Sequence, residues 1–437
     1  MSLPIVILGS GLAGFTLARE FRKLDLATPL VIVSRDAAGF YSKPMLSNAL
    51  AGKKTAATLV MKPAEQMAAD LKATVRARST VRHIDVAAAT VEFDDGQTLA
   101  YRDLVLALGA DPIRLPLAGG AADSVLSVND LDDYARFAER LESARSVLIL
   151  GAGLIGCEFA NDLLARGIAP TVVDLAAWPL SRLLPPEAGQ RLHDKLAGAG
   201  AVFHFGVAVS RVDRAASGAL QVTLDDGSQL HADLVLSAIG LRPRTALAAE
   251  AGIATAHGVV TDRLLATSAP HVHALGDCAE VQGHHLPYVL PIMQQARALA
   301  ATLAGTPTPV VYPAMPVTVK TPACPTVVCP PPLGASGEWK VDLSDAGCDA
   351  RFESADGQLL GFALLGASTS LRQALGARVA GLVHCSGSKR RAAAGSIGSD
   401  NPLWQRALIT TRRQRRKGRP WKTSSSGSDV WPGWSAC

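Results

Sequence analysis

One pattern of apolar and polar positions occurs twice along this 437-residue chain. Each copy begins with a short, unbroken apolar run, 4–8 or 147–150, of the kind that predicts a buried parallel strand. A glycine-rich turn follows, and then a stretch with helical spacing that ends near residue 22 or 166. A second apolar strand comes next, at 29–34 or 170–174. The pattern therefore predicts two strand–helix–strand units with parallel sheets.

Both copies continue with a hairpin and a further buried strand. An Asp-Asp-Gly turn interrupts the alternating segments 90–99 and 222–230, which is typical of a hairpin. The buried strands 104–108 and 234–239 follow, and each ends in a glycine. Beyond Gly240 a strand at 272–277 and a helix at 292–304 return the chain to the first copy. The second copy is thus an internal duplication inserted in the first.

The two glycine turns have the spacing of a dinucleotide-binding loop. They are Gly9-Ser10-Gly11-Leu12-Ala13-Gly14 and Gly151-Ala-Gly153-Leu154-Ile155-Gly156. The first glycine permits a tight turn, the second lets a pyrophosphate approach the backbone, and the third lets the helix pack on the strand. The helix N-terminus then holds the phosphates with its free amides and positive dipole end. Two such loops predict two dinucleotides, such as a flavin and a nicotinamide.

A third, smaller module follows the duplicated part. Strands are predicted at 317–321 and 326–328, a break at Pro330–Pro332, and a helix at 370–380. The predicted fold class is α/β, with two Rossmann-like dinucleotide-binding domains and a small C-terminal α+β domain. The expected domains are an FAD-binding domain in two parts (1–113 and 241–313), an inserted NAD-binding domain (114–240), a C-terminal domain (314–383) and a basic tail (384–437).

The net charge of +5 comes from the tail alone. Residues 384–437 hold 11 Lys and Arg against 2 Asp and Glu, which leaves 32 against 36 in the rest of the chain. A nucleic-acid-binding function would therefore rest on the tail, and we do not expect one. The tail has no apolar period and carries four of the six tryptophans. We expect it to be disordered, and hypothesise that it is a read-through or frameshift artefact.

Membrane, disulfide and metal functions find little support in the sequence. No apolar run reaches the ~18 residues of a membrane span, and the N-terminus lacks a basic signal region, so a soluble cytoplasmic protein is expected. The seven cysteines have no disulfide or zinc spacing. The histidines, including those at 271, 273, 284 and 285, fit no ligand pattern, and no metal site is predicted.

The ends of the two second strands point to different nucleotide contacts. Asp174 ends the later strand, where a carboxylate accepts from both ribose hydroxyls and repels a 2′-phosphate, so we prefer NADH over NADPH. The earlier strand ends in Ser34-Arg35-Asp36, with a serine in the position of the usual acid. Asp36 is either a displaced ribose contact or an ordinary loop aspartate.

Over about residues 3–383 the chain resembles the FAD-dependent pyridine nucleotide-disulfide oxidoreductase superfamily, and within it the bacterial rubredoxin–NAD reductases. Besides the glycine loops, the resemblance rests on Tyr41-Ser-Lys-Pro-Met-Leu-Ser47, Asp103-Leu-Val-Leu-Ala-Leu-Gly-Ala110, Asn129-Asp-Leu-Asp-Asp-Tyr134, Gly151-Ala-Gly-Leu-Ile-Gly-Cys-Glu-Phe-Ala-Asn-Asp162, Gly240-Leu-Arg-Pro-Arg244, Ala274-Leu-Gly-Asp-Cys278 and Met315-Pro-Val-Thr-Val-Lys-Thr-Pro-Ala-Cys-Pro325. The glycine loops indicate only the superfamily. The Tyr-Ser-Lys-Pro and Val-Thr-Val-Lys-Thr-Pro segments indicate the narrower group.

The chain departs from the superfamily in its cysteines. Disulfide reductases of this fold carry Cys-x4-Cys after the FAD loop, where this chain has Phe40-Tyr-Ser-Lys43-Pro44. The Cys-x-x-Cys of thioredoxin reductases is also missing, because Cys157 stands alone, and so is the single redox cysteine of NADH oxidases and peroxidases. Electrons from a reduced flavin are therefore expected to leave for another protein.

The resemblance also implies roles for particular residues. Lys43 and Glu158 are expected to meet beside flavin N5, where the lysine stabilises the negative charge of the reduced flavin and the glutamate holds the lysine. Asp277 should bind the FAD ribityl hydroxyls, and the helix after Pro291 should point its N-terminus at the flavin. Lys320 is placed near the flavin. The remaining cofactor contacts are expected at Gly9, Ser10, Gly11, Leu12, Ala13, Gly14, Ser34, Arg35, Asp36, Pro44, Val81, Ala107, Gly151, Gly153, Leu154, Ile155, Gly156, Asp174, Gly240 and Val289.

The expected function is a flavoprotein reductase that passes electrons from NADH through FAD to rubredoxin. A basic rim of Arg242, Arg244, Arg297 and Lys320 is expected to steer the acidic rubredoxin. Two alternatives stay open: a reductase of a [2Fe–2S] ferredoxin in an oxygenase system, and a redox-responsive binding protein resembling apoptosis-inducing factor. The sequence leaves open whether the rubredoxin serves alkane hydroxylation or defence against reactive oxygen.

Overall fold

A computed structural model of the protein describes residues 2–381. The expectations for the basic tail, its disorder and its origin lie outside these residues. Within residues 2–381 every helix is too short or too polar to cross a membrane.

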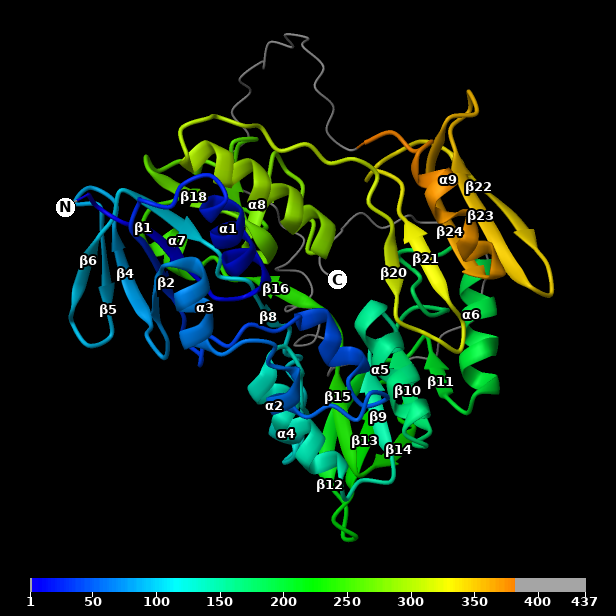
Figure 1. The fold of residues 1–437 in the computed structure, drawn as a ribbon. Coiled ribbons are helices and arrows are strands. Elements are labelled where there is room, and N and C mark those ends of the chain that lie inside the picture. Colours follow the sequence, from blue (N-terminus) through cyan, green and yellow to red (C-terminus); the bar gives the residue numbers. More distant parts are fainter. Residues whose placement is uncertain (1, 382–437) are drawn as a thin grey trace, which may run out of the picture. The chain divides into compact units, whose positions relative to one another are not determined.

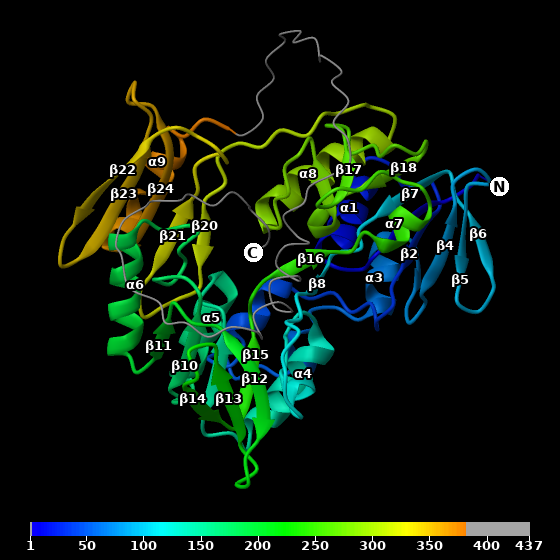
Figure 2. The ribbon, with the colours of Figure 1, turned by 180° about the vertical axis from the view of Figure 1, so that it is seen from behind.

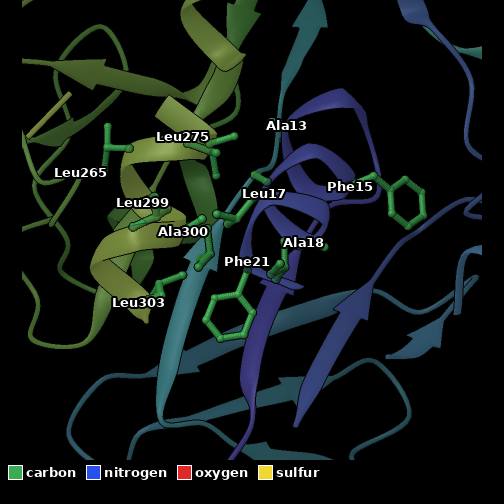
Figure 3. Packing of buried hydrophobic residues seen from close by; sticks show 14 of the residues in the cluster. Ala13, Phe15, Leu17, Ala18, Phe21, Leu265, Leu275, Leu299, Ala300 and Leu303 are labelled. Carbon is green, nitrogen blue, oxygen red and sulfur yellow. The ribbon is translucent and has the colours of Figure 1, made fainter. Parts of the chain in front are cut away.

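The first parallel sheet has the strand order β18-β7-β1-β2-β3. Four of its strands precede the inserted copy and the fifth follows it, so the chain does return to the first sheet. Figure 3 shows α1 and α8 side by side, with Leu17 and Phe21 of α1 near Leu299 and Leu303 of α8. The elements are β1 (Ile5–Leu8), α1 (Leu12–Arg22), β2 (Leu30–Val33), β3 (Thr74–Arg76), β7 (Asp103–Leu106), β18 (Val272–Ala274) and α8 (Val289–Leu303).

The second parallel sheet, with the order β11-β10-β9-β15, repeats the first plan. Its central strands β9 and β10 pair in the register Leu150↔Val173, as β1 and β2 pair at Leu8↔Val33. The glycine turn therefore leaves the sheet at the same place in both copies. The elements are α4 (Leu131–Leu141), β9 (Val147–Leu150), α5 (Leu154–Ala165), β10 (Pro170–Asp174), α6 (Pro186–Gly198), β11 (Val202–Phe205) and β15 (Leu234–Ser237).

The predicted hairpins exist, and each is part of a three-stranded antiparallel sheet. The two sheets consist of β4 (Val81–Asp85), β5 (Thr90–Phe93) and β6 (Thr98–Ala100), and of β12 (Val209–Arg214), β13 (Leu220–Leu224) and β14 (Gln229–Ala232). The two crossings between the copies, β8 (Ala110–Pro112) and β16 (Leu241–Pro243), pair antiparallel with each other. Smaller elements are α7 (Ala246–Glu250), β17 (Val259–Thr261) and β19 (Ala279–Val281).

The third module is a five-stranded antiparallel sheet in the order β20-β21-β24-β23-β22. Its elements are β20 (Val317–Val319), β21 (Thr326–Cys329), β22 (Glu338–Leu343), β23 (Gly347–Glu353), β24 (Leu359–Gly366) and α9 (Arg372–Gly376). The helix predicted at 370–380 is shorter, because Ala367–Leu371 is a 3₁₀ turn. Helix α6 contacts β23 and β24, as both views show (Figure 1, Figure 2), and Leu192 and Leu196 share a core with Leu365.

One segment that precedes the insertion packs with the inserted copy. The segment comprises the 3₁₀ helix η1 (Lys43–Asn48) and α2 (Ala56–Leu59); α3 (Ala64–Leu71) follows it. Leu46, Ala49, Leu50 and Leu59 are buried in the same core as Phe159 and other residues of the second sheet and its helices. The predicted boundaries placed residues 43–59 in the first domain, whereas their side chains help to fill the core of the second.

Candidate active site

The first glycine loop has one open position between two tightly packed ones. Gly9 has φ +124°, and a Cβ on it would lie 2.1 Å from the carbonyl oxygen of Ala107. A Cβ on Gly14 would lie 1.9 Å from the carbonyl oxygen of Gly9, whereas one on Gly11 would meet no heavy atom within 4 Å. The outer glycines are therefore required by packing, and the middle one leaves space where a pyrophosphate approaches.

The second loop repeats this geometry. Gly151 has φ +99°, and a Cβ on it would lie 2.8 Å from the carbonyl oxygen of Ala238. A Cβ on Gly156 would lie 1.9 Å from the carbonyl oxygen of Gly151. Gly153 again meets nothing within 4 Å. Gly11 and Gly153 are the N-cap residues of α1 and α5 and provide no side-chain cap, so the first amides of both helices are available to an anion. Leu12 and Ala13, like Leu154 and Ile155, form these first turns.

The two second strands end in related polar networks. The carboxylate of Asp174 accepts from the amide of Ala152 at 2.5 Å and from that of Ala176 at 2.7 Å. In the first copy the corresponding position is Ser34, whose hydroxyl lies 2.6 Å from that of Ser10 and donates to Asp36 at 2.6 Å. The serine thus connects the glycine loop to a carboxylate two residues further on. Asp36 is part of the loop network, and its contact with a ribose stays a prediction.

Lys43 and Asp277 lie close enough to form an ion pair. Lys43 Nζ lies 3.9 Å from Asp277 Oδ2, and both side chains are partly buried. Burial lowers the pKa of Lys43, and the carboxylate of Asp277 opposes this effect. Asp277 lies in the turn Gly276–Cys278, where Gly276 has φ +79°. The pair joins two residues that the sequence resemblance placed separately at the flavin.

The expected contact between Lys43 and Glu158 is not formed. Glu158 is fully buried, and its Oε2 accepts from Ser47 Oγ and from Lys320 Nζ, each at 2.5 Å. Its Oε1 accepts from the amide of Lys320 at 2.9 Å. Among the described residues the ion pair of Glu158 is with Lys320. The carboxylate is taken up by these closer donors, while Lys43 lies nearer Asp277.

Two neighbours of Glu158 were missed at the sequence level. Asn161 Oδ1 accepts from the amide of Ala323 at 2.9 Å. Asp162 accepts from the amides of Leu50 at 2.9 Å and Ala51 at 2.8 Å. Burial raises the pKa of Asp162 to about 6. The sequence does carry a sign of them: Glu158, Asn161 and Asp162 have the spacing i, i+3, i+4 in a helix that is otherwise apolar, which places three polar side chains on one face.

The remaining predicted contacts occupy several elements. Pro44 lies in η1, Val81 begins β4 and Val289 begins α8. Gly240 has φ +115° between β15 and β16. Arg35 Nη2 lies 3.7 Å from Asp111 Oδ1.

The predicted basic rim is only partly available. Arg244 is bound to Asp111 at 2.6 Å and donates to the carbonyl of Leu108 at 2.7 Å, and Lys320 is bound to Glu158. Arg242 and Arg297 are exposed. Two of the four cations are thus paired with carboxylates within the fold, and the clustering of the four near the flavin stays a prediction.

All five cysteines in residues 2–381 are buried, and the histidines there belong to no metal-binding group. Burial raises the pKa of Cys278, Cys329 and Cys348 to about 11 in each case. Within the same residues, no group of three or more His, Cys, Asp and Glu side chains is arranged to hold a metal ion.

Two family models match successive parts of the chain. Residues 3–301 match the pyridine nucleotide-disulphide oxidoreductases. Residues 309–379 match the rubredoxin binding C-terminal domain.

Named relatives match over nearly their whole length. The chain is 52% identical to the rubredoxin-NAD(+) reductase of Alcanivorax borkumensis, over 83% of this chain and 95% of the relative. It is 39% identical to the nitric oxide reductase FlRd-NAD(+) reductase of Aeromonas salmonicida, over 84% and 94%. Among solved structures, a ferredoxin reductase from Rhodopseudomonas palustris matches with a TM-score of 0.79 and 28% identity, over 87% of this chain and 96% of that one.

Proposed function

Since the chain belongs to the pyridine nucleotide-disulphide oxidoreductase family and has a rubredoxin-binding C-terminal domain, we propose that it is an NADH-dependent flavoprotein reductase that passes electrons to rubredoxin. The observation that carries this proposal is the domain at 309–379, because it concerns the electron acceptor, whereas the two nucleotide modules are common to the whole family. Two relatives named for this reaction match over 83% and 84% of this chain and over 95% and 94% of their own length.

We assign FAD to the first glycine loop and NADH to the second. The open positions at Gly11 and Gly153, with the uncapped helix starts behind them, suit two pyrophosphates. Asp174 supports NADH, because a 2′-phosphate on the ribose would meet a carboxylate. When bound, FAD would provide a group that can accept a hydride from NADH and give up electrons one at a time.

Lys43 and Asp277 provide the charge arrangement for this chemistry. The ammonium of Lys43 is partly buried, so its field is screened less than that of a surface lysine. We assign to it the stabilisation of negative charge in the first module. Burial lowers the pKa of Lys43, and the carboxylate of Asp277 opposes this effect and so favours the charged form.

The cysteines support an exit of electrons to a partner protein. A disulfide reductase needs a reactive thiolate, and the described cysteines are buried with the pKa of three of them raised to about 11. A thiol relay of that kind is therefore not available in residues 2–381. A second candidate acceptor is a [2Fe–2S] ferredoxin, because the fold is shared with a ferredoxin reductase.

The test compares the two acceptors under anaerobic conditions with NADH as the donor. We expect kcat/KM to be at least ~100-fold higher for oxidised rubredoxin than for a [2Fe–2S] ferredoxin, equivalent to about 2.7 kcal/mol. The opposite preference would reassign the protein to the ferredoxin reductases. Absence of NADH-dependent flavin reduction would contradict both assignments.

A further inference from the structure

Resting on the proposed function, we propose that Asn161 and Asp162 of α5 are positioning residues that hold the two lysine-bearing segments of the site in register with Glu158. The segments are 43–51, which carries Lys43, and 319–324, which carries Lys320. One face of α5, in the second module, thus binds a segment that precedes the insertion and a segment of the third module.

The three polar residues of α5 are buried and all bind other segments. Glu158 is 0%, Asn161 7% and Asp162 1% exposed. Their spacing of i, i+3 and i+4 places them on one face of the helix. A buried polar group destabilises a fold unless it is hydrogen-bonded, and here each acceptor is used by a donor from outside α5. The polar side chains of this face therefore bind other segments of the chain and do not stabilise α5 alone.

Asp162 fixes the segment that follows Lys43. It accepts from two consecutive amides, those of Leu50 and Ala51, so both of its oxygens are engaged. A continuous 3₁₀ helix runs from Lys43 to Asn48, directly before these amides. Leu46 and Leu50 of the segment are buried in the core of the second sheet. A shift at residues 50–51 is therefore transmitted along a short, packed element to Lys43.

Asn161 fixes the segment that carries Lys320. Its side chain accepts from the amide of Ala323, three residues beyond Lys320. The turn between them is tight, because Thr321 Oγ1 donates to the carbonyl of Cys324 at 2.8 Å and the amide of Cys324 donates to the carbonyl of Thr321 at 2.8 Å. Glu158 then receives both the amide and the ammonium of Lys320. Lys320 is thus held at two points of α5.

The chemistry of Asp162 argues against simple filling of the core. One amide that it binds belongs to Leu50, which is buried in an apolar core with Ala49 and Phe159, so an apolar side chain would satisfy packing alone. Burial disfavours the charged form of the carboxylate, yet the group occupies this place with both amides bound to it. A carboxylate that binds two successive amides sets the position of a backbone segment, which an apolar residue does not do.

The test uses the full-length holoenzyme with Asp162→Asn. An asparagine accepts at only one of its two atoms, so one of the two amides loses its partner. The control is Asp233→Asn, because Asp233 accepts from two consecutive amides, those of Arg145 and Ser146, at 2.8 and 2.9 Å, but through the single oxygen Oδ2. The side-chain oxygen of asparagine can keep both of these bonds, so this variant removes a carboxylate charge without freeing an amide. We would measure hydrogen exchange of residues 47–54 and the limiting rate of flavin reduction by NADH, together with the Kd for NADH.

For Asp162→Asn we expect faster exchange at 47–54, a limiting rate at least ~10-fold lower, and a Kd for NADH within about two-fold of the wild type. Asp233→Asn should leave the rate and the exchange at 47–54 unchanged. Faster exchange with an unchanged rate would overturn the positioning role. A wild-type enzyme that NADH does not reduce would instead overturn the proposed function.

Asn161→Ala provides a second test that stands even if Asp162→Asn does not fold. It removes the acceptor of the Ala323 amide and leaves the Lys43 segment untouched. We expect electron transfer from the reduced enzyme to rubredoxin to slow at least ~5-fold, with flavin reduction by NADH within about two-fold of the wild type. Equal slowing of both steps, or of neither, would contradict separate positioning of the two lysines.

Discussion

Asp162 shows how one buried carboxylate makes the stability of the protein depend on pH. Its pKa is about 6 in the folded chain, against about 3.9 for an unperturbed aspartate. The folded state therefore binds the proton more tightly than the unfolded state. The stabilisation from this proton is fully present below about pH 4 and is lost as the pH rises through about 6.

The first prediction follows from that sign. In wild type, this one group should add about 2 kcal/mol to the free energy of unfolding as the pH falls from 7.5 to 4.5. Asp162→Asn lacks the titration, so the difference in unfolding free energy between wild type and variant should grow by that amount. Urea unfolding at the two pH values measures it, and a difference independent of pH would contradict the assignment.

Asp233→Asn is the control, because the pKa of Asp233 is shifted the other way. Backbone amides lower the pKa of that carboxyl. Its contribution is therefore present above the unfolded pKa and is lost as the pH falls. The two variants should differ in the sign of their pH dependence.

At the scale of elements, each strand–glycine–helix unit separates packing from ligand binding. Gly14 faces a carbonyl oxygen at 1.9 Å from an added Cβ, whereas Gly11 faces open space. The absence of a side chain at Gly14 is needed for the chain to fold. The absence of a side chain at Gly11 leaves space for a ligand, so the two glycines should respond differently to the same substitution.

Gly14→Ala should destabilise the protein by several kcal/mol, because the helix must move away from the strand. Gly11→Ala should change the melting temperature of the flavin-free protein by no more than about 2 °C, but weaken FAD binding at least ~10-fold. Thermal unfolding of apoprotein and a titration with FAD measure the two effects. A large loss of apoprotein stability in Gly11→Ala would contradict the open position.

Elements whose pattern is local in the sequence were predicted, and elements that depend on pairing between distant segments were not. The runs 4–8 and 147–150 are local and apolar, so strands β1 and β9 and the loops after them were predictable. Strands β22, β23 and β24 were missed: the first two mix charged and apolar residues, and their sheet depends on pairing between distant segments. Motifs predicted Lys43, Glu158, Asp277 and Lys320 as site residues. Which of them pair depends on the three-dimensional arrangement, and the pairs are Lys43–Asp277 and Lys320–Glu158.

At the scale of the whole described chain, α5 is the place where the modules are connected. Glu158 binds Ser47 from the segment before the insertion and Lys320 from the third module. Helix α6 joins the third sheet through a shared apolar core. The modules are therefore tied together by both a buried ion pair and apolar packing.

Lys320→Met should lower the free energy of unfolding by about 2–3 kcal/mol, because it leaves the buried carboxylate of Glu158 without its cation. This loss is smaller than for a fully buried ion pair, because the side chain of Lys320 is 24% exposed and solvent screens the charge. Glu158→Gln in the same chain should recover part of the loss. Urea unfolding of the two single variants and the double variant measures the coupling, and strict additivity would contradict it.

The packing of residues 43–59 also limits what protein engineers can exchange. A chimera that received only residues 114–240 from this protein would inherit a core that lacks Leu46, Ala49, Leu50 and Leu59. The recipient would have to supply matching side chains from its own corresponding segment, or the graft would contain a void. To change nucleotide preference by module exchange, the transplanted unit should therefore include residues 43–59, although they are not contiguous with it.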